Sequence, residues 1–380
     1  MCRLGGSAVR LAALPYVNDA IIGATLPGLL LAKALLARGP DHRVLILDAR
    51  QRLHNEPTIV GVSEAGVHGR QTQRWSSLNL ADGVRAACPL AGSAAISWYH
   101  ELCRQVLATG RARIVMNAPV RSVAHRGLSN ILYSRARPVR CGRVHVFDGT
   151  AVPSGERCLV RRVTGMNVHA ERAVFQADTV RLLPLSGRAT APASVGLIAV
   201  LPFSHHDAYV QRVDIARRQA DLPTAPPAAM MADIVEALRC QQRLETGSVH
   251  SQLSYWGLHA RGPHLRERIY RHAQSATLGQ LVFGHDPYLL ADRMGTFAET
   301  LTREDLPVLE PLRFGLGGLA ARLTASLIDW PRGGLLHVLA ELAGGCSNER
   351  FLRYFCGQST TFDQVALLGL ISRYGSARAA

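Results

Sequence analysis

The sequence of 380 residues predicts an α/β fold with three parts: a Rossmann-like dinucleotide-binding domain, an inserted antiparallel β substrate domain and a helical C-terminal region. Three observations carry this prediction. A glycine turn separates an apolar strand from an apolar helix near residue 23, strand-like segments follow one another through the middle of the chain, and helix formers dominate after residue 286. The corresponding ranges are 17–160 with 270–300, 161–269, and 301–380.

The composition suits a folded enzyme that the cell keeps in its cytoplasm. Hydrophobic residues make up 48% of the chain, which also contains 34 glycines. The most apolar run, 21–36, is broken by Thr25, Pro27 and Lys33, so it predicts a buried strand and helix rather than a membrane span. The first residues lack the apolar segment and cleavage site of a secretory signal, so none is expected.

The net charge of +15 would suit a polyanion or an anionic membrane surface. Nearly all of the positive charge is arginine, since Lys33 is the only lysine, and the arginines are spread along the chain without a dense run. Nucleic-acid binding is therefore not expected. Peripheral contact with the inner face of the membrane is the better expectation, because it needs only a diffuse positive field.

Neither a metal site nor a disulfide framework is expected. The eight cysteines contain no C-x-x-C pair, and reduced thiols are the simplest interpretation. The run His205-His206-Asp207 could suggest a metal site, but adjacent histidines on a turn rarely point at one ion and no further ligand is suitably spaced.

The first part of the chain reads as strand, helix and strand. VNDAII is a short apolar strand, GLLLAKALLARG is a helix closed by Gly39 and Pro40, and RVLILD is a buried strand. The polar, glycine-rich stretch 51–89 permits no assignment. A helix over 93–109 follows, and ARIVMN and RVHVFDG predict two more strands.

The rest of the chain changes from strands to helices. Apolar and polar residues alternate between 161 and 213, notably in VRLLPLS and SVGLIAVLPFS, which predicts an antiparallel sheet. Residues 216–270 mix the helix ADIVEALRCQQRLE with the proline-rich loop LPTAPPAAM. The later segments PYLLADRMGTFAETL, GGLLHVLAELAG, ERFLRYF and FDQVALLGLISRY predict helices.

The glycine turn has the outline of a G-x-G-x-x-G nucleotide loop. Gly23 and Gly28 hold its first and third positions, and Thr25 replaces the middle glycine, where its Cβ would crowd a phosphate while its hydroxyl could donate to one. Asp48 follows Gly28 by twenty positions at a strand end, where a carboxylate would accept hydrogen bonds from a ribose. The alternative is a plain βαβ unit with an incidental acid.

Four further segments resemble one family, the bacterial lycopene β-cyclases, in the same order along the chain. They are VFDGTAV (146–152), SVGLIAVLPFSHHDAYVQRVD (194–214), LGQLVFGHDPYLLADRMG (278–295) and RYFCGQSTTFDQVALLG (353–369). The similarity extends from about residue 17 to 370. It implies a flavoprotein fold of the glutathione-reductase type, with FAD as cofactor, NAD(P)H as reductant and an apolar polyene or isoprenoid as substrate.

The family reaction is a cyclisation without net redox change, in which an acid protonates a terminal double bond and a base later removes a proton. Residue by residue, Gly23, Gly28 and Asp48 match the nucleotide loop, and Thr25 stands in its middle position. The resemblance adds Asp148 and Gly149 in the second flavin motif and Gly279 in the third. Thr150 and Pro184 stand where the family has other functional residues.

The family's acid/base glutamate falls on Gln211, which cannot exchange a proton at physiological pH. Asp207 and Asp214 lie nearby and could take over its role, or they could be solvent-facing carboxylates. Three functions therefore stay open: a lycopene cyclase-like isomerase, an FAD-dependent monooxygenase or oxidoreductase of secondary metabolism, and a catalytically inactive relative that binds a carotenoid or a partner.

Overall fold

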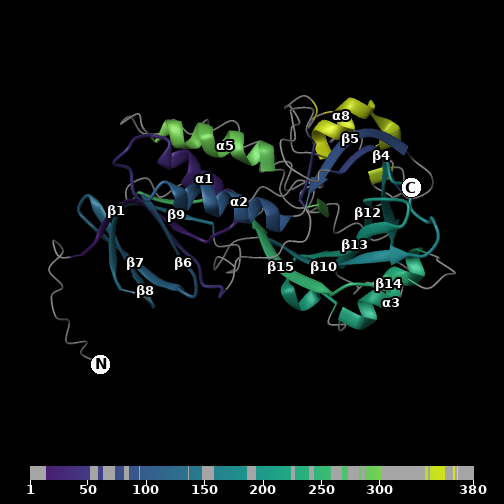
Figure 1. Ribbon diagram of the computed structural model, residues 1–380, viewed down its shortest axis with the longest axis horizontal. Coiled ribbons are helices and arrows are strands. Elements are labelled where there is room, and N and C mark those ends of the chain that lie inside the picture. Colours follow the sequence, from purple (N-terminus) through teal and green to yellow (C-terminus); the bar gives the residue numbers. More distant parts are fainter. Residues whose placement is uncertain are drawn as a thin grey trace, which may run out of the picture.

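The computed structural model describes residues 14–51, 59–62, 73–80, 85–93, 95–135, 137–147, 158–185, 194–223, 227–238, 244–257, 268–272, 282–283, 287–301, 339–340, 343–355, 363 and 366. Within these residues the strands form two sheets, one of seven strands and one of nine. Figure 1 shows them in opposite halves of the long axis, with helices α1, α2 and α5 beside the first sheet. The mixed α/β fold expected from the sequence is confirmed. No helix in the described part of the chain is long and apolar enough to cross a bilayer.

The first sheet has a parallel centre in the order β6-β2-β1-β9-β16. The hairpin of β7 and β8 extends it, because β8 pairs antiparallel with the first half of β9. All four side chains of β2 are buried, as expected for a parallel strand covered on both faces. The strands are β1 Tyr16–Ile22, β2 Val44–Leu47, β6 Ala112–Val115, β7 Val120–Arg126, β8 Ser129–Ser134, β9 Val139–Val146 and β16 Ile269–Arg271.

Three helices cover one face of this sheet: α1 Leu26–Leu36, α2 Ala95–Ala108 and α5 Pro287–Thr300. Helix α1 is buried on most sides, because leucines occupy both the surface that faces the strands and the surface that faces α2 and α5. Thr25 is its N-cap and Pro27 lies in its first turn, where a missing N–H costs no helical hydrogen bond. This packing fixes the glycine turn against the carboxyl ends of the parallel strands.

The second sheet has the order β14-β10-β13-β12-β11-β4-β5-β3, with β15 also paired to β10. Helix α3 packs on one of its faces, over a core that includes Met166, Ile198 and Val210. Helix α8 contacts β5. The elements are β3 Ile59–Val62, β4 Gln73–Asn79, β5 Arg85–Ser93, β10 Cys158–Ala170, β11 Thr179–Pro184, β12 Ser194–Pro202, β13 Asp207–Ala216, η3 Gln219–Asp221, α3 Pro227–Leu238, β14 Leu244–Thr246, β15 His250–Gly257 and α8 Asn348–Phe355.

The sheet pairing refines the ranges expected from the sequence. The stretch 59–93 lies inside the range 17–160, but its strands β3, β4 and β5 belong to the second sheet. The reason is long-range pairing: β4 runs parallel to β11, about a hundred positions later, and no local pattern reports such a partner. Asp148, Gly149 and Gly279 lie outside the described residues.

Candidate functional site

The glycine turn after β1 has the backbone geometry that a nucleotide loop requires. Gly23 has a φ of 104°, in the left-handed region that favours glycine, and its N–H donates to the Leu47 carbonyl at 2.8 Å. A Cβ on Gly28 would lie 2.4 Å from the Gly23 carbonyl oxygen. The first glycine therefore makes the turn, and the third lets α1 pack directly on it.

The N–H groups at the start of α1 are engaged by side chains of the chain itself. The Gly28 N–H donates to Thr25 Oγ1 at 3.3 Å, and the Leu26 N–H donates to the hydroxyl of Tyr99 at 3.1 Å. Pro27 has no N–H to offer. Tyr99 comes from α2 and is buried, so its hydroxyl stands at the position where a phosphate oxygen would meet the helix dipole.

Asp48 lies just after β2 and turns its buried carboxylate toward this loop. One oxygen accepts from the Ala24 N–H at 2.6 Å and from Arg50 Nη2 at 2.6 Å, and the other accepts from the Arg50 N–H and Nε at 2.8 and 2.9 Å. Burial alone would raise the pKa of Asp48. The hydrogen bonds and charge of Arg50, with the Ala24 N–H, outweigh burial and hold that pKa below its usual value.

These groups fit the adenosine ribose and the pyrophosphate of a dinucleotide. The ionised Asp48 is an acceptor for ribose hydroxyls, and the Arg50 guanidinium, a quarter exposed, is a cation for phosphate. Thr25 and Tyr99 supply hydroxyls in place of free backbone donors. A nucleotide would have to take over bonds that Arg50 and Tyr99 make within the chain.

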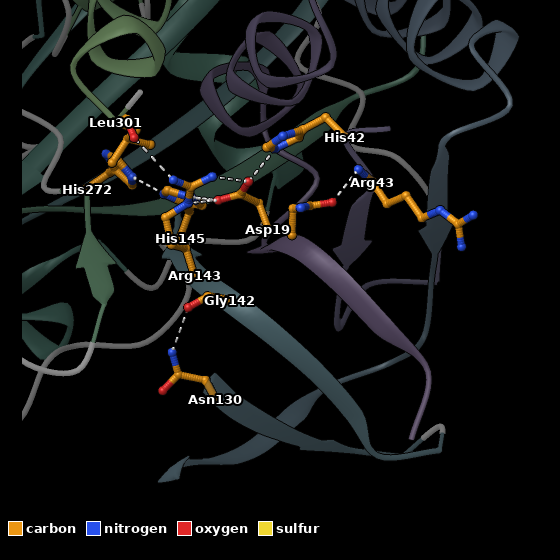
Figure 2. Close-up of polar contacts among 10 residues, drawn as sticks. Asp19, His42, Arg43, Asn130, Gly142, Arg143, His145, His272 and Leu301 are labelled. Carbon is orange, nitrogen blue, oxygen red and sulfur yellow. Dashed lines mark hydrogen bonds and ion pairs between the residues drawn. The ribbon is translucent and has the colours of Figure 1, made fainter. Parts of the chain in front are cut away.

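A second polar cluster lies beneath the loop, between the first sheet and α5 (Figure 2). Its centre is Asp19 on β1, which is fully buried. Asp19 accepts from His42 Nε2 at 2.6 Å, from Arg143 Nε and Nη2 at 2.6 and 3.0 Å, and from His145 Nε2 at 2.9 Å. Arg143 also donates to the Leu301 carbonyl at 3.3 Å, so the cluster ties the end of α5 to β1 and β9.

The cluster continues from His145 to His272, whose rings face each other with Nδ1 of His145 3.3 Å from Nε2 of His272. Asp19 can only accept, so His145 must present Nε2–H to it and leave Nδ1 as the acceptor for His272. Burial lowers the pKa of both imidazoles, and Asp19 only partly opposes this at His145. Both rings are therefore neutral at physiological pH.

The register of the strands places His272 at the nucleotide end of the sheet. Ile22, Val146 and Arg271 are partners on β1, β9 and β16. His272 directly follows β16, and its ring stacks flat on that of Phe147 with the ring centroids 4.2 Å apart. The chain of contacts from Asp19 through His145 to His272 therefore extends toward the carboxyl ends of the strands, where Gly23 forms the turn.

Gln211 lies on the second sheet with its side chain almost completely buried, at 4% exposure. Its amide Nε2 donates to the Val282 carbonyl at 2.7 Å, and Arg161 Nη2 donates to the same oxygen at 3.2 Å. Val282 belongs to the segment 278–295, one of the four segments that resemble the lycopene cyclases. Both donors converge on one backbone oxygen, so Gln211 acts here as a fixed hydrogen-bond donor.

The structure does not bring Asp214 or Asp207 together with Gln211. Asp214 is on the same strand but an odd number of positions away, so it faces the opposite side of the sheet, where Arg212 binds both of its oxygens. Asp207 is exposed at the start of β13 and pairs with His169 at 2.7 Å. Within the described residues, no group of three or more His, Cys, Asp or Glu could hold a metal ion.

A family model described as lycopene cyclase protein matches residues 19–243, which is more than half of the chain. This chain belongs to the lycopene cyclase family. The match covers the glycine turn, Asp48 and the strand that carries Gln211, and it confirms the resemblance on which the alignment of these residues rests. No curated protein sequence matches the chain.

Several solved enzymes share the fold at low sequence identity. The halogenase PltM, in complex with phloroglucinol and FAD, has a TM-score of 0.61 and 11% identity, covering 95% of this chain and 92% of PltM. The p-nitrophenol 4-monooxygenase PnpA from Pseudomonas putida DLL-E4 has a TM-score of 0.60 and 11% identity, covering 94% and 98%. The Diels-Alderase PyrE3 has a TM-score of 0.55 and 14% identity, covering 90% and 81%. These similarities establish the fold.

The two sites predicted from the sequence differ in what the structure brings together. Gly23, Gly28 and Asp48 meet as the sequence spacing indicates, whereas the amide of Gln211 donates to the Val282 carbonyl and Asp214 faces the other side of the sheet. Sequence reasoning missed Arg50 and the hydroxyl of Tyr99 as polar groups at the loop. The signal in the sequence that could have indicated Arg50 is its position two residues after Asp48, the acid expected to bind the ribose.

Proposed function

We propose that this lycopene cyclase-family chain binds FAD and uses it for redox chemistry on an apolar polyene or isoprenoid, instead of the family's acid/base cyclisation. When bound, FAD supplies electron transfer, which needs no ionisable side chain at the glutamate position. The chain's own residues bind the nucleotide, orient it and keep water away from the substrate.

The observation that carries the proposal is the state of Gln211. A cyclase needs a group that can give and take a proton where the carbocation forms, and a nearby negative charge to stabilise it. Gln211 has no charge, and its donor is already bound to Val282. The described acid nearest to it in sequence, Asp214, faces the other side and is held by Arg212. These contacts favour a reaction that takes its chemistry from the cofactor.

The nucleotide would be held at the edge of the first sheet. Asp48 would accept from the ribose, and Arg50 would neutralise phosphate charge. Thr25 and Tyr99 would present hydroxyls at the start of α1. Asp148, Gly149 and Gly279 keep the cofactor-binding roles implied by the family resemblance.

The test is product analysis with lycopene under reducing conditions, using FAD-loaded protein. We expect no cyclic product from the wild type, and flavin oxidation coupled to modification of an apolar polyene in air. A cyclic product from the wild type would contradict the proposal and would favour the lycopene cyclase-like isomerase instead. Gln211→Glu is the matched variant: if it gains cyclisation while the wild type has none, the alignment of position 211 is correct and the lost carboxyl explains the lost reaction.

A further inference from the structure

The order of the first sheet determines which strands lie on either side of the nucleotide loop. The chain passes from β1 through α1 to β2 on one side of β1, and β9 pairs with β1 on the other side, followed by β16. Ligands of such sheets bind outside the carboxyl ends of the strands, where the strand order reverses. Because Asp48 follows β2, an adenosine ribose belongs on the β2 side. The part of a dinucleotide beyond its pyrophosphate then extends over the ends of β9 and β16.

His272 lies at that edge, directly after β16. Its backbone N–H donates to the carbonyl of Val146, the last residue of β9, at 3.0 Å. Asp19 and His145 are fully buried, whereas His272 is only partly buried. The chain of polar contacts in Figure 2 therefore runs from the interior of the protein to the edge that faces the nucleotide.

Two aromatic rings fix the orientation of the His272 side chain. Phe147 stacks flat on it, with ring centroids 4.2 Å apart and 2° between the ring planes. Phe297 on α5 meets it edge-on, at 4.8 Å and 87°. Packing of this kind needs only a flat apolar ring, so it does not explain why the ring carries two nitrogens.

The hydrogen bonds of the chain determine which of these nitrogens accepts. The ionised Asp19 can only accept, so His145 presents Nε2–H to it and accepts at Nδ1 from Nε2–H of His272. Burial lowers the pKa of His272 and keeps its ring neutral, so its own Nδ1 carries a lone pair and no proton. No residue in the described part of the chain donates to this nitrogen. His272 is thus an acceptor of fixed orientation.

A neutral imidazole acceptor is complementary to a hydroxyl group, which can donate, and not to a phosphate oxygen, which can only accept. Beyond its pyrophosphate, FAD carries a ribityl chain with hydroxyl groups. We infer that His272 accepts a hydrogen bond at Nδ1 from a ribityl hydroxyl of FAD, and that Asp19 and His145 are positioning residues that hold it in the accepting tautomer. This inference rests on the FAD binding proposed above and adds a contact to the flavin half of the cofactor.

The experiment compares the affinities of FAD and ADP for the full chain by calorimetry. ADP has no ribityl chain, so it reports on the adenosine side alone. His272→Phe keeps the stacked ring and removes the acceptor. It should weaken FAD binding about fivefold, as expected for the loss of one hydrogen bond, and leave ADP binding unchanged. His272→Asn, whose amide oxygen can accept near the position of Nδ1, should retain most of the affinity for FAD.

The matched control is His42→Gln. His42 also contacts Asp19, at 2.6 Å, but it precedes β2 at the amino ends of the strands. The ratio of FAD to ADP affinity should therefore stay at the wild-type value. Equal losses of FAD and ADP binding in His272→Phe, or the same FAD-specific loss in His42→Gln, would reduce His272 to a structural role and overturn the inference.

Nitrogen NMR of the histidine side chains gives a second readout, with His272→Phe to assign the signals. We expect His272 to be in the Nε2–H tautomer in the free wild type. Its Nδ1 resonance should move to lower frequency when FAD is added, because the nitrogen then accepts a hydrogen bond, and should stay in place with ADP. A ring protonated at Nδ1, or a resonance that FAD leaves unchanged, would refute the assignment.

These outcomes separate the inference from the proposed function. A wild type that binds ADP but not FAD would overturn both. FAD binding that is equal in the wild type and in His272→Phe would overturn the inference alone. A cyclic product from FAD-loaded wild type would overturn the proposed redox function and leave the contact of His272 with the ribityl chain intact.

Discussion

Asp19 shows how a single buried carboxylate can organise one half of the molecule. Burial would raise its pKa, but hydrogen bonds from His145, His42 and Arg143 and the charges around it hold that pKa well below the usual value. The carboxylate is therefore ionised and joins β1, β9 and the end of α5. Removing one member of such a network leaves the others buried without a partner.

Asp19→Asn should lower the free energy of unfolding by about 3–5 kcal/mol, because Arg143 would lose a buried counter-charge. Urea unfolding followed by circular dichroism measures this. Asp207→Asn is the control, since its pair with His169 is exposed and screened, and its loss should be severalfold smaller. Equal losses in the two variants would mean that the cluster does not support the fold.

The two buried histidines make stability depend on pH in a fixed direction. The pKa of His145 and the pKa of His272 are both lowered in the folded chain, so below about pH 6.5 the unfolded chain binds more protons. Asp19, with its lowered pKa, adds the same trend at lower pH. The free energy of unfolding should therefore fall as the pH falls from 7 to 5.

His272→Phe tests that dependence, since a phenyl ring can keep the stack on Phe147 without titrating. Thermal unfolding of the variant and the wild type should be compared across this pH range. We expect a shallower decline for the variant. A decline as steep as that of the wild type would assign the pH dependence to other groups.

At the scale of elements, the sequence predicted the βαβ unit correctly because each signal in it is local. Gly23 and Gly28 frame α1, Thr25 caps it, and Asp48 follows a fully apolar strand. The helix expected over 93–109 is confirmed as α2, and the strand SVGLIAVLP as β12.

The elements that the sequence missed depend on distant partners. Strands β3 to β5 lie in a stretch whose sequence is polar and rich in glycine, and β4 joins the rest of the second sheet by pairing with β11. The same holds for the Asp19 cluster, because His145 and His272 lie more than a hundred positions from Asp19 and from each other. Their convergence follows from the strand order, which no local periodicity records.

Gly28→Ala tests the close contact between α1 and the glycine turn. The added Cβ would meet the Gly23 carbonyl oxygen at 2.4 Å, so helix and turn would have to separate. We expect a loss of about 1–3 kcal/mol in the free energy of unfolding, measured in urea, together with weaker FAD binding.

Gly39→Ala provides the matched control, because no atom lies within 4 Å of the Cβ that it would add. It should unfold at the same urea concentration as the wild type or a higher one. If Gly28→Ala behaves like Gly39→Ala, the turn and the helix are not in the contact described.

At the scale of the whole molecule, the two sheets divide the proposed work. The first holds the nucleotide loop and the Asp19 cluster, and the second presents Gln211 and Arg161 to the Val282 carbonyl. The chain shares its fold with the lycopene cyclase family, and the amide of Gln211 is the basis of the proposed change from proton chemistry to redox chemistry. The central claim is that the nucleotide site survives this divergence.

Titration of FAD into the purified wild-type protein and into Asp48→Ala, followed by visible absorbance and flavin fluorescence, tests that claim most directly. We expect the wild type to bind FAD in a single stoichiometric phase. Asp48→Ala should bind about tenfold or more weakly, because the ribose loses its buried acceptor. A wild type that stays colourless at saturating FAD, or equal affinity in the two proteins, would contradict it.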